Sequence, residues 1–333
     1  MIGHPSPLGG ADTELDHQMR CWAEMGIRVH VCHTGAVTAD LERMGLTARG
    51  CVYHAPRDWA SLDGLDCISF CNGEFLAALP EIKRHARSTT FVNCMTFNFD
   101  LELEMQARGL IDFHVYQTDH GMERVGARLR TMERYRPLRV TPYFHAADFP
   151  FHERRPADAF RFGRISRADP GKFHPRQLWI YETMTAPVPK AGLVVGWSDA
   201  VAAKVGRSPE PYIAAVSPGW TSAQEFYRFC DAVVMSTDTF ENLPRVGFEA
   251  MASGSILVVD DRGGWRLQVE SGRTGWLCAD EREFVYRSSR LAFEPGEREE
   301  MRRNAKERLL GGWGFQAAAE SWADVFRAVS RLQ

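Results

Sequence analysis

The sequence predicts an α/β protein made of two Rossmann-like domains, each with a parallel sheet covered by helices. Short β-like runs alternate with amphipathic segments along the chain, which is typical of parallel strands joined by right-handed crossovers. Several runs, such as 193–195 and 256–259, are apolar on both faces, as expected where helices cover both sides of a sheet. The 333 residues exceed one ordinary core and suit two domains of about 150 residues each.

The expected elements follow from these patterns in chain order. The expected strands cover 27–32, 67–71, 89–94, 111–117, 160–163, 192–196, 232–236 and 255–260. The expected helices lie near 12–25, 75–86, 122–135, 174–184, 222–230 and 246–252. Only Met1 and Ile2 precede Gly3, so the first strand is either very short or starts ahead of this sequence.

The Pro- and charge-rich stretch 148–156 predicts the linker between the domains. We therefore expect an N-terminal Rossmann-like domain over 1–148 and a C-terminal one over 149–312. A closing amphipathic helix is expected within 313–333, after a glycine-rich break at 311–314.

The composition and net charge disfavour several classes of protein. The net charge of −3 disfavours a dedicated nucleic-acid binder. No apolar run approaches the roughly 20 residues that span a bilayer, and the N-terminus lacks the pattern of a signal peptide. The eight cysteines are scattered without a C-x-x-C pair, so we expect free thiols in a reducing cytoplasm.

The segment 122–139 is locally basic, with six arginines against two glutamates. Met122, Val125, Leu129 and Met132 recur there at helical spacing, which predicts an amphipathic helix with a basic face. A solvated outer helix is the simpler interpretation. The alternative is contact with an anionic acceptor or a membrane surface, which would make the protein peripheral to the membrane.

Two loops that follow expected strands carry glycines or cations. Ligands of open α/β sheets bind at the carboxyl ends of the strands, so these loops are candidate binding segments. Gly9 and Gly10 precede a helix whose N–H groups can meet an anion, although a plain turn is an equal alternative. Arg164 and Lys172 follow strand 160–163 and can stabilise a leaving diphosphate without a metal, the alternative being ordinary solvated cations.

The segment 239–254 is the most specific. Pro244 is typical of the first turn of a helix and Gly254 of its end, so Glu241 lies just before the helix and Glu249 in its second turn. A helical carboxylate can accept both hydroxyls of a ribose, a carboxylate ahead of the helix can meet sugar hydroxyls, and the helix N–H groups can meet phosphate. A capped helix with one buried and one exposed glutamate is the alternative.

A fourth loop, 260–265, carries Asp260 and Asp261 before two glycines. An adjacent acidic pair is weak grounds for a metal site, so we expect a structural turn beside the ligand and no metal.

The C-terminal half resembles the retaining glycosyltransferases of family 4, which have the GT-B fold. The resemblance covers roughly 160–280 and consists of Gly163-Arg164, Lys172, two glutamates with seven residues between them (Glu241 and Glu249), and the segments 249–254, 263–264 and 271–277. Gly9-Gly10 with its helix is similar as well, as is the closing helix 315–332, which crosses back to the N-terminal domain in such enzymes. The middle of the N-terminal domain is similar only in outline.

The resemblance implies an enzyme of the hexosyltransferase type. It would move a sugar from a nucleotide diphosphate, with a UDP-sugar favoured and a GDP-sugar second. The hydroxyl acceptor is unidentified and would be a small molecule, a lipid-linked sugar or a polysaccharide, bound by the N-terminal domain. No cofactor and no metal are expected. In such enzymes the leaving phosphate helps to deprotonate the acceptor.

The same resemblance implies roles for single residues. Arg164 and Lys172 would hold the diphosphate, Glu249 the ribose, and Glu241 the donor sugar. The other donor-site residues it implies are Gly9, Gly10, Ser217, Asn242, Leu243 and Pro244.

On the acceptor side, the family's histidine after the strand that ends at Asn93 is absent. His120 and His145 are candidate substitutes, a structural role being the simpler interpretation for each.

Other functions remain open. A sugar-nucleotide epimerase of the same architecture would need acid–base residues and no acceptor. A non-catalytic module that binds a nucleotide-sugar shares the fold as well. A nicotinamide dehydrogenase is disfavoured, because no complete G-x-G-x-x-G follows a strand.

Overall fold

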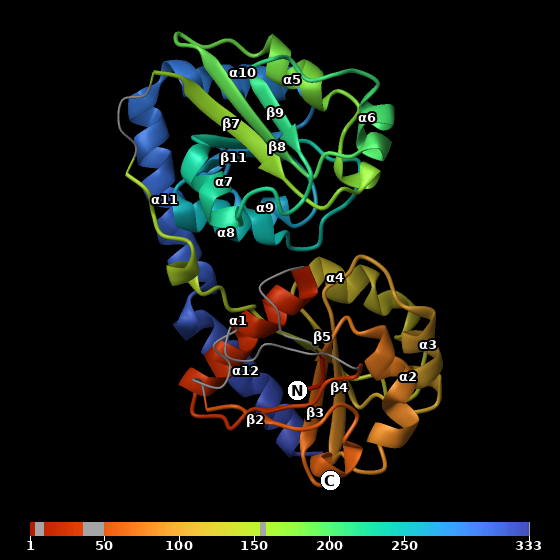
Figure 1. The fold of residues 1–333 in the computed structure, drawn as a ribbon. Helices are drawn as coiled ribbons and strands as arrows, with labels where there is room; N and C mark the ends of the chain where they lie inside the picture. The colour runs from red at the N-terminus through yellow and green to blue at the C-terminus, as the bar shows by residue number, and fades with distance from the viewer. Residues whose placement is uncertain (4–9, 36–49, 154–157, 333) are drawn as a thin grey trace. The chain divides into compact units, whose positions relative to one another are not determined.

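The computed structural model describes residues 1–3, 10–35, 50–153 and 158–332. The chain divides into two compact units. Unit 1 combines Met1–His145 with Trp313–Gln333, and unit 2 consists of Ala146–Gly312. The chain therefore leaves unit 1 once and returns to it at its end (Figure 1).

Unit 1 is built on a parallel sheet of four strands in the order β3-β4-β5-β6. Their bounds are Asp66–Phe70, Ser88–Asn93, Phe113–Tyr116 and Pro137–Arg139. A second parallel pair consists of β1 (His30–Val31) and β2 (Val52–Tyr53). Ile2 joins the two, because it bridges Cys32 in parallel and its N–H donates to the carbonyl of Ile68 at 2.9 Å. In the described residues, Ile2 is the part of the expected first strand that pairs.

Unit 1 contains the helices α1 Gly10–Glu24, α2 Gly73–Ile82, α3 Asp100–Ala107, α4 Asp119–Arg124 and α12 Phe315–Ser330. Three of them, α1, α2 and α12, bury aromatic side chains against this sheet. The rings of Trp22 on α1 and Trp322 on α12 meet edge to face, with centroids 4.9 Å apart. Trp322 also donates through Nε1 to Gln18 of α1 at 2.7 Å. Helix α12 therefore belongs to the core of unit 1 (Figure 1).

The expected amphipathic helix over 122–135 is wrong. Helix α4 ends at Arg124, a short 3-10 turn follows at Gly126–Arg128, and the chain then enters β6. The backbone has turned by Arg134, whose φ is +62°. Gly126 lies against the hydroxyl of Tyr135, which returns toward β5 and hydrogen-bonds to Tyr116. A compact turn thus buries Val125 and Leu129 and leaves Met122 and Met132 half-buried, while the arginines remain exposed.

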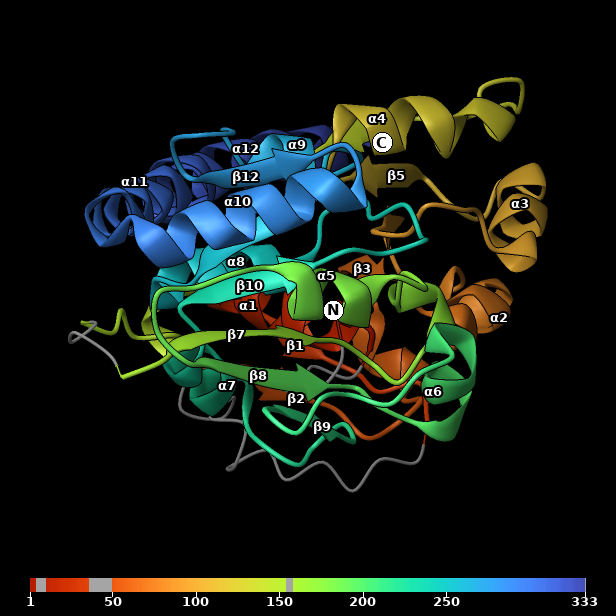
Figure 2. The ribbon, with the colours of Figure 1, turned by 90° about the horizontal axis from the view of Figure 1, so that it is seen from above.

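Unit 2 contains one parallel sheet of six strands in the order β12-β11-β10-β7-β8-β9. Their bounds, in chain order from β7 to β12, are Phe160–Ile165, Lys190–Val195, Ile213–Val216, Ala232–Met235, Ile256–Asp260 and Gly275–Cys278. Figure 2 shows β10, β7, β8 and β9 side by side. Since β7 pairs with β8 on one side and with β10 on the other, the strand order reverses between β7 and β10.

Helices cover both faces of this sheet. Their bounds are α5 Gln177–Thr183, α6 Asp199–Val205, α7 Ala223–Phe229, α8 Arg245–Ser253, α9 Trp265–Gln268 and α10 Glu281–Phe293. Helices α5 and α10 pack together on one face, and α7 and α8 on the other (Figure 1). The double cover explains why β10 and β11 are buried along their whole length. Both units have the Rossmann-like layering that the sequence predicts.

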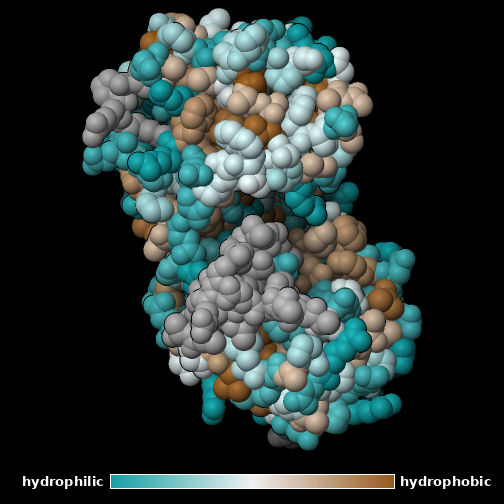
Figure 3. Space-filling view, in the orientation of Figure 1, coloured by the Kyte–Doolittle hydropathy of each residue, from teal (hydrophilic) through white to brown (hydrophobic). Residues whose placement is uncertain are grey.

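Helix α11 (Pro295–Trp313) differs from the expectation, because it runs through Gly311 and Gly312. The break comes only at Gly314, the N-cap of α12. A glycine inside a helix costs about 1 kcal/mol, and the buried stripe that includes Met301 and Leu309 offsets this cost. The rest of α11 is largely hydrophilic at its surface (Figure 3).

Over the described residues, no helix is long and apolar enough to cross a bilayer. Five of the eight cysteines are buried. Hydrophilic and hydrophobic residues are interspersed on the face of unit 2 drawn in Figure 3, as on an ordinary water-exposed surface.

Candidate functional site

Unit 2 brings together two of the loops that the sequence singled out. Strand β7 is followed by a loop that ends in a 3-10 turn, η5, at Pro170–Lys172. Strand β10 is followed by 236–244, which leads into α8. These strands are neighbours at the point where the strand order reverses, and connections leaving in opposite directions there open a crevice. The site therefore lies where open α/β sheets bind ligands.

Lys172 and Glu241 meet in this place, although they are 69 residues apart in the sequence. The ammonium Nζ donates to the carboxylate Oε1 at 2.6 Å. The side chains are 20% and 14% exposed, so both are reached by solvent but held in one geometry. The hydroxyl of Thr239 donates to the same oxygen at 3.5 Å. A bound anion would compete with Glu241 for the ammonium, and the carboxylate would then be open to hydroxyl donors.

Arg164 lies beneath this pair and is fully buried. Its Nη1 donates to Gln177 at 2.9 Å and to the carbonyl of Ser236 at 3.0 Å, and its Nη2 donates to the carbonyl of Lys172 at 2.5 Å. The guanidinium also stacks on Phe173, 3.7 Å from the ring centroid. Burial lowers the pKa of Arg164 to about 10, which leaves it charged at neutral pH. Both terminal nitrogens of Arg164 thus donate to protein oxygens, and direct contact with a diphosphate stays a prediction.

Glu249 is in the second turn of α8, as expected. The hydroxyl of Tyr227 donates to its Oε2 at 2.8 Å. Burial raises the pKa of Glu249 above the ordinary range, and the charge of Arg245 and the Tyr227 hydrogen bond oppose this rise. Gly254 ends α8 in the left-handed conformation with φ +79°, whereas Pro244 is the N-cap, one position before the first helical residue.

The backbone of Asn242 and Leu243 is supported by the turn after β11. The N–H of Gly264 donates to the carbonyl of Glu241 at 2.8 Å. Gly264 lies so close to Asn242 and Leu243 that a Cβ atom would not fit without displacing them. The loop 260–265 is thus a structural turn that shapes the segment before α8.

Asp260 anchors the same loop from β11. Its carboxylate accepts the N–H of Thr237 at 2.9 Å and the hydroxyl of Ser236 at 3.1 Å. Burial raises its pKa, and the charge of Arg262 opposes the rise. Asp261 pairs instead with Arg266 at 2.7 Å. Within the part of the chain that the structure describes, no three His, Cys, Asp or Glu side chains gather in a group that could hold a metal ion.

The other predicted residues lie elsewhere. Ser217 is exposed at the carboxyl end of the edge strand β9. Gly9 lies outside the described residues, and Gly10 is the first residue of α1. His120 is exposed near the start of α4. His145 lies 2.8 Å through Nδ1 from the hydroxyl of Tyr143, and its N–H donates to the Nδ1 atom of His17 at 2.8 Å. Gly10 and both histidines belong to unit 1, and Ser217 belongs to unit 2.

Sequence reasoning missed two groups of the site. Lys204, in the last turn of α6, donates to the carbonyl of Pro170 at 2.8 Å and pairs with Asp238 at 2.6 Å. Tyr227 on α7 reaches Glu249. Neither residue stands in a local motif, and only the packing of helices against the sheet brings them to the site. A helix-facing tyrosine 22 residues before a key glutamate gives no signal of its own.

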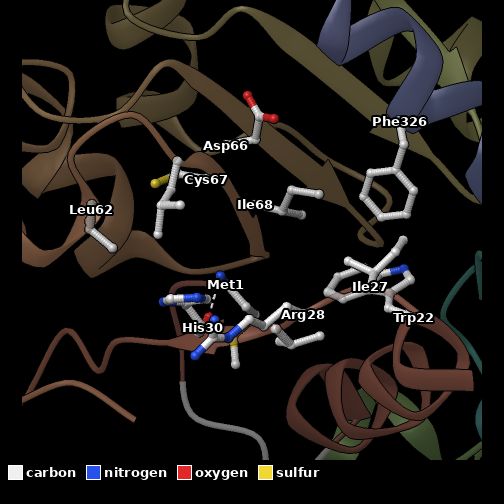
Figure 4. Close-up of a pocket in the computed structure, with 12 residues that line it drawn as sticks. Met1, Trp22, Ile27, Arg28, His30, Leu62, Asp66, Cys67, Ile68 and Phe326 are labelled. Carbon is white, nitrogen blue, oxygen red and sulfur yellow. Dashed lines mark hydrogen bonds between the residues drawn. The ribbon is translucent and has the colours of Figure 1, made fainter. Parts of the chain in front are cut away.

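A cavity of about 210 Å³ in unit 1 is separate from these loops. It lies at the amino ends of β1 and β3, whose first residues are His30 and Asp66, and Trp22 and Phe326 line it (Figure 4). The Met1 ammonium donates to the carbonyl of His30 at its edge, 2.7 Å away. Ligands of such sheets bind at the opposite, carboxyl edge. None of the predicted site residues lines this cavity.

A family model and a sequence relative match a part of this chain, whereas solved structures match nearly its whole length. Residues 217–308 match the family model described as Glycosyl transferases group 1. The spore coat protein SA of Bacillus subtilis (strain 168) is 28% identical over 103 residues, which is 30% of this chain. The match spans 27% of that protein, about a quarter of its length.

Solved structures match over nearly the whole chain. HepE of Anabaena, crystallised with UDP and glucose, has a TM-score of 0.72 at 15% identity and covers 98% of both chains. A sucrose-phosphate synthase from Thermosynechococcus elongatus has a TM-score of 0.68 at 15% identity, covering 100% of this chain and 96% of that one. At such identities the likeness shows the fold. The chain therefore has the fold of these structures, GT-B, and residues 217–308 are similar to the glycosyltransferases of group 1.

Proposed function

We propose that the protein is a retaining, metal-independent glycosyltransferase of family 4 that moves a sugar from a nucleoside diphosphate to a hydroxyl acceptor. One observation carries the proposal. Glu241 and Glu249 stand on either side of the start of α8, at the carboxyl end of β10, and Lys172 reaches Glu241 from the neighbouring loop. UDP is the first choice of nucleotide and GDP the second, since the structures of HepE contain UDP or UDP-glucose.

In this proposal the ion pair between Lys172 and Glu241 breaks when the donor binds, and each side chain then contacts the donor. Lys172 leaves Glu241 for the diphosphate, whose charge the N-terminal N–H groups of α8 also meet. Glu241 then accepts hydroxyls of the sugar, and the backbone of Asn242 and Leu243 faces the same group. Glu249 accepts the ribose hydroxyls, and Ser217 lies toward the base.

Transfer breaks the bond between the sugar C1 and the phosphate oxygen, and the electron pair stays on that oxygen. The acceptor hydroxyl oxygen bonds to C1 on the same face, and its proton passes to the leaving phosphate. Lys172 and the α8 N–H groups stabilise the charge that develops on the phosphate. Unit 1 would bind the acceptor, with Gly10 approaching the phosphate and His120 and His145 as acceptor-side candidates. The scattered cysteines, without a C-x-x-C pair, favour the reducing cytoplasm as the compartment.

Thermal unfolding with UDP, GDP, ADP and TDP in turn, in EDTA, tests the donor site. A ligand at 100 times its dissociation constant adds about 2.7 kcal/mol to the stability of the folded state, which raises Tm measurably. We expect a shift with one nucleotide that is lost in Glu249→Ala. No shift with any nucleotide in EDTA would contradict the metal-independent site.

Turnover separates this activity from the alternatives. We expect slow hydrolysis of the matching nucleotide-sugar, because water can replace the acceptor. Glu241→Ala should mainly lower kcat, whereas Glu249→Ala should mainly raise KM, since ribose binding is shared by ground and transition states. Formation of an epimer without acceptor would indicate an epimerase. Binding without turnover of any donor would indicate a non-catalytic module.

A further inference from the structure

Two cationic side chains cross-link the loop that carries Lys172 to the loop that carries Glu241. The fully buried Arg164 donates to the carbonyl of Lys172 at 2.5 Å and to the carbonyl of Ser236 at 3.0 Å. Lys204 donates to the carbonyl of Pro170 at 2.8 Å and to the carboxylate of Asp238 at 2.6 Å. Each cation therefore holds one atom of the 170–172 turn and one atom of the 236–241 loop.

The two cross-links act on different parts of the same turn. Arg164 meets the last residue of η5 from below, and Lys204 meets the first residue from α6. The turn itself has short internal hydrogen bonds, from the N–H of Gly171 to the Asp169 carboxylate at 2.8 Å and from the N–H of Lys172 to the Asp169 carbonyl at 2.9 Å. Its position against the 236–241 loop depends on the contacts between them.

We propose that Lys204 and Asp238 are positioning residues for the Lys172–Glu241 pair, and that Arg164 shares this role. The inference rests on the proposed function, because it gives the pair a donor to hold. The Lys204–Asp238 pair holds the 170–172 turn against the 236–241 loop. This fixes the position of the Lys172 ammonium, so that the ammonium can contact the diphosphate. A shift of about 1 Å at such a group costs about a hundredfold in rate.

The variant Asp238→Asn tests the proposal, because a direct charge effect and a positioning role predict opposite changes in nucleotide affinity. If Lys204 were simply a cation that binds the diphosphate, Asp238→Asn would remove a competing negative charge and strengthen nucleotide binding. If Lys204 acts through its hold on Asp238, the same variant releases the turn and weakens binding. The sign of the change therefore separates a ligand from a positioning residue.

The first experiment measures the affinity of the full-length protein for UDP by titration calorimetry. We expect Lys204→Met and Asp238→Asn each to weaken UDP binding by about tenfold, because each variant removes a contact that positions Lys172. Methionine keeps the packing of the lysine stem in α6. The control is Arg207→Gln, which removes a cation from an ion pair of the same 2.6 Å length with Glu182 that touches neither loop. We expect no change there, and tighter or unchanged binding in Asp238→Asn would overturn the proposal.

A double-mutant cycle tests whether Lys204 acts through Lys172. In a Lys172→Ala background, Lys204→Met should change UDP affinity by less than about twofold, because the group it positions is gone. A full and additive loss in that background would show that Lys204 acts by another route.

Hydrogen exchange tests the cross-link without any nucleotide. In Lys204→Met, the amides of 171–173 should exchange faster, while Arg207→Gln leaves them unchanged. Unchanged exchange in Lys204→Met would overturn the positioning role even if UDP binds. If wild type binds no nucleotide but exchange rises in Lys204→Met, the proposed function fails and the cross-link stands.

Discussion

Replacing Gly264 with alanine tests whether the backbone before α8 holds the donor. Gly264 has an ordinary helical conformation, with φ −63° and ψ −18°, so alanine adds no backbone strain. Its Cβ atom would instead lie 2.6 Å from the carbonyl carbon of Asn242 and 2.9 Å from the Cα of Leu243. Real Cβ contacts essentially never fall below 3.0 Å, and the carbonyl oxygen of Asn242 would lie nearer still than its carbon, so this segment must retreat by more than the 0.4 Å between 2.6 and 3.0 Å.

The displacement reaches Glu241, because the N–H of Gly264 holds its carbonyl at 2.8 Å. Binding and catalytic groups need to be held within about 0.5 Å, and a 1 Å misplacement costs about a hundredfold. We expect Gly264→Ala to lower kcat/KM for hydrolysis of the nucleotide-sugar by about ten- to a hundredfold. The free energy of unfolding should fall by about 1–3 kcal/mol, as for an overpacked site.

The assay is initial-rate hydrolysis together with urea unfolding of the same samples. Gly311→Ala is the matched control, because a Cβ there meets no atom within 4 Å and the residue lies inside α11. This variant should gain about 0.5–1 kcal/mol of stability and keep its rate. Wild-type kcat/KM in a folded Gly264→Ala protein would refute the assignment of the Asn242–Leu243 backbone to the donor site.

Three further predictions follow from the site and the surface. Arg164→Met should lower the free energy of unfolding in urea by about 3 kcal/mol or more, because it removes the buried cation that donates to the carbonyl of Lys172, and one of the donors to the carbonyl of Ser236 and to the amide oxygen of Gln177; a loss below 1 kcal/mol would contradict the anchoring role. Burial raises the pKa of Glu249, so lowering the pH protonates it and removes a hydroxyl acceptor. Affinity for an intact nucleotide-sugar should therefore fall as pH drops through that raised pKa, and Glu249→Gln should bind with no such dependence; an identical pH profile in both proteins would disprove the ribose role. If the exposed arginines of 122–139 meet an anionic membrane, the protein should sediment with phosphatidylserine vesicles at low salt. Arg128→Glu with Arg130→Glu should then abolish sedimentation, each arginine contributing about 1 kcal/mol; wild-type protein left in the supernatant would favour the solvated surface.

Local chemistry made much of the fold and the place of Glu241 and Glu249 around the start of α8 predictable. Strands β10 and β11 are apolar on both faces because helices cover both, so their sequence carries the architecture directly. Gly254 ends α8 because the left-handed C-cap favours glycine. The spacing that sets Glu241 before α8 and Glu249 within it is likewise local.

Features that depend on tertiary packing could not be predicted from the sequence. Nothing in the sequence indicated that Arg164 would donate to the carbonyls of Lys172 and Ser236, because only the fold brings these groups near; its contact with a diphosphate stays a prediction. The apolar spacing over 122–135 predicted a helix, but contact between Gly126 and Tyr135 favoured a turn. The glycines at 311–312 predicted a break, but packing along the rest of α11 carried the helix through them.

Because α12 packs in unit 1 but follows unit 2 in the sequence, the order in which the two units are completed during synthesis is fixed. Chains emerge from the ribosome N-terminus first, and domains fold as units. Unit 2 is continuous from Ala146 to Gly312, so its whole sequence has been made while unit 1 still lacks Trp322. The indole of Trp22 then has no partner on α12 until the last turns of the chain appear. Of the two units, unit 1 starts first and is completed last, so its apolar face stays uncovered until α12 has been made.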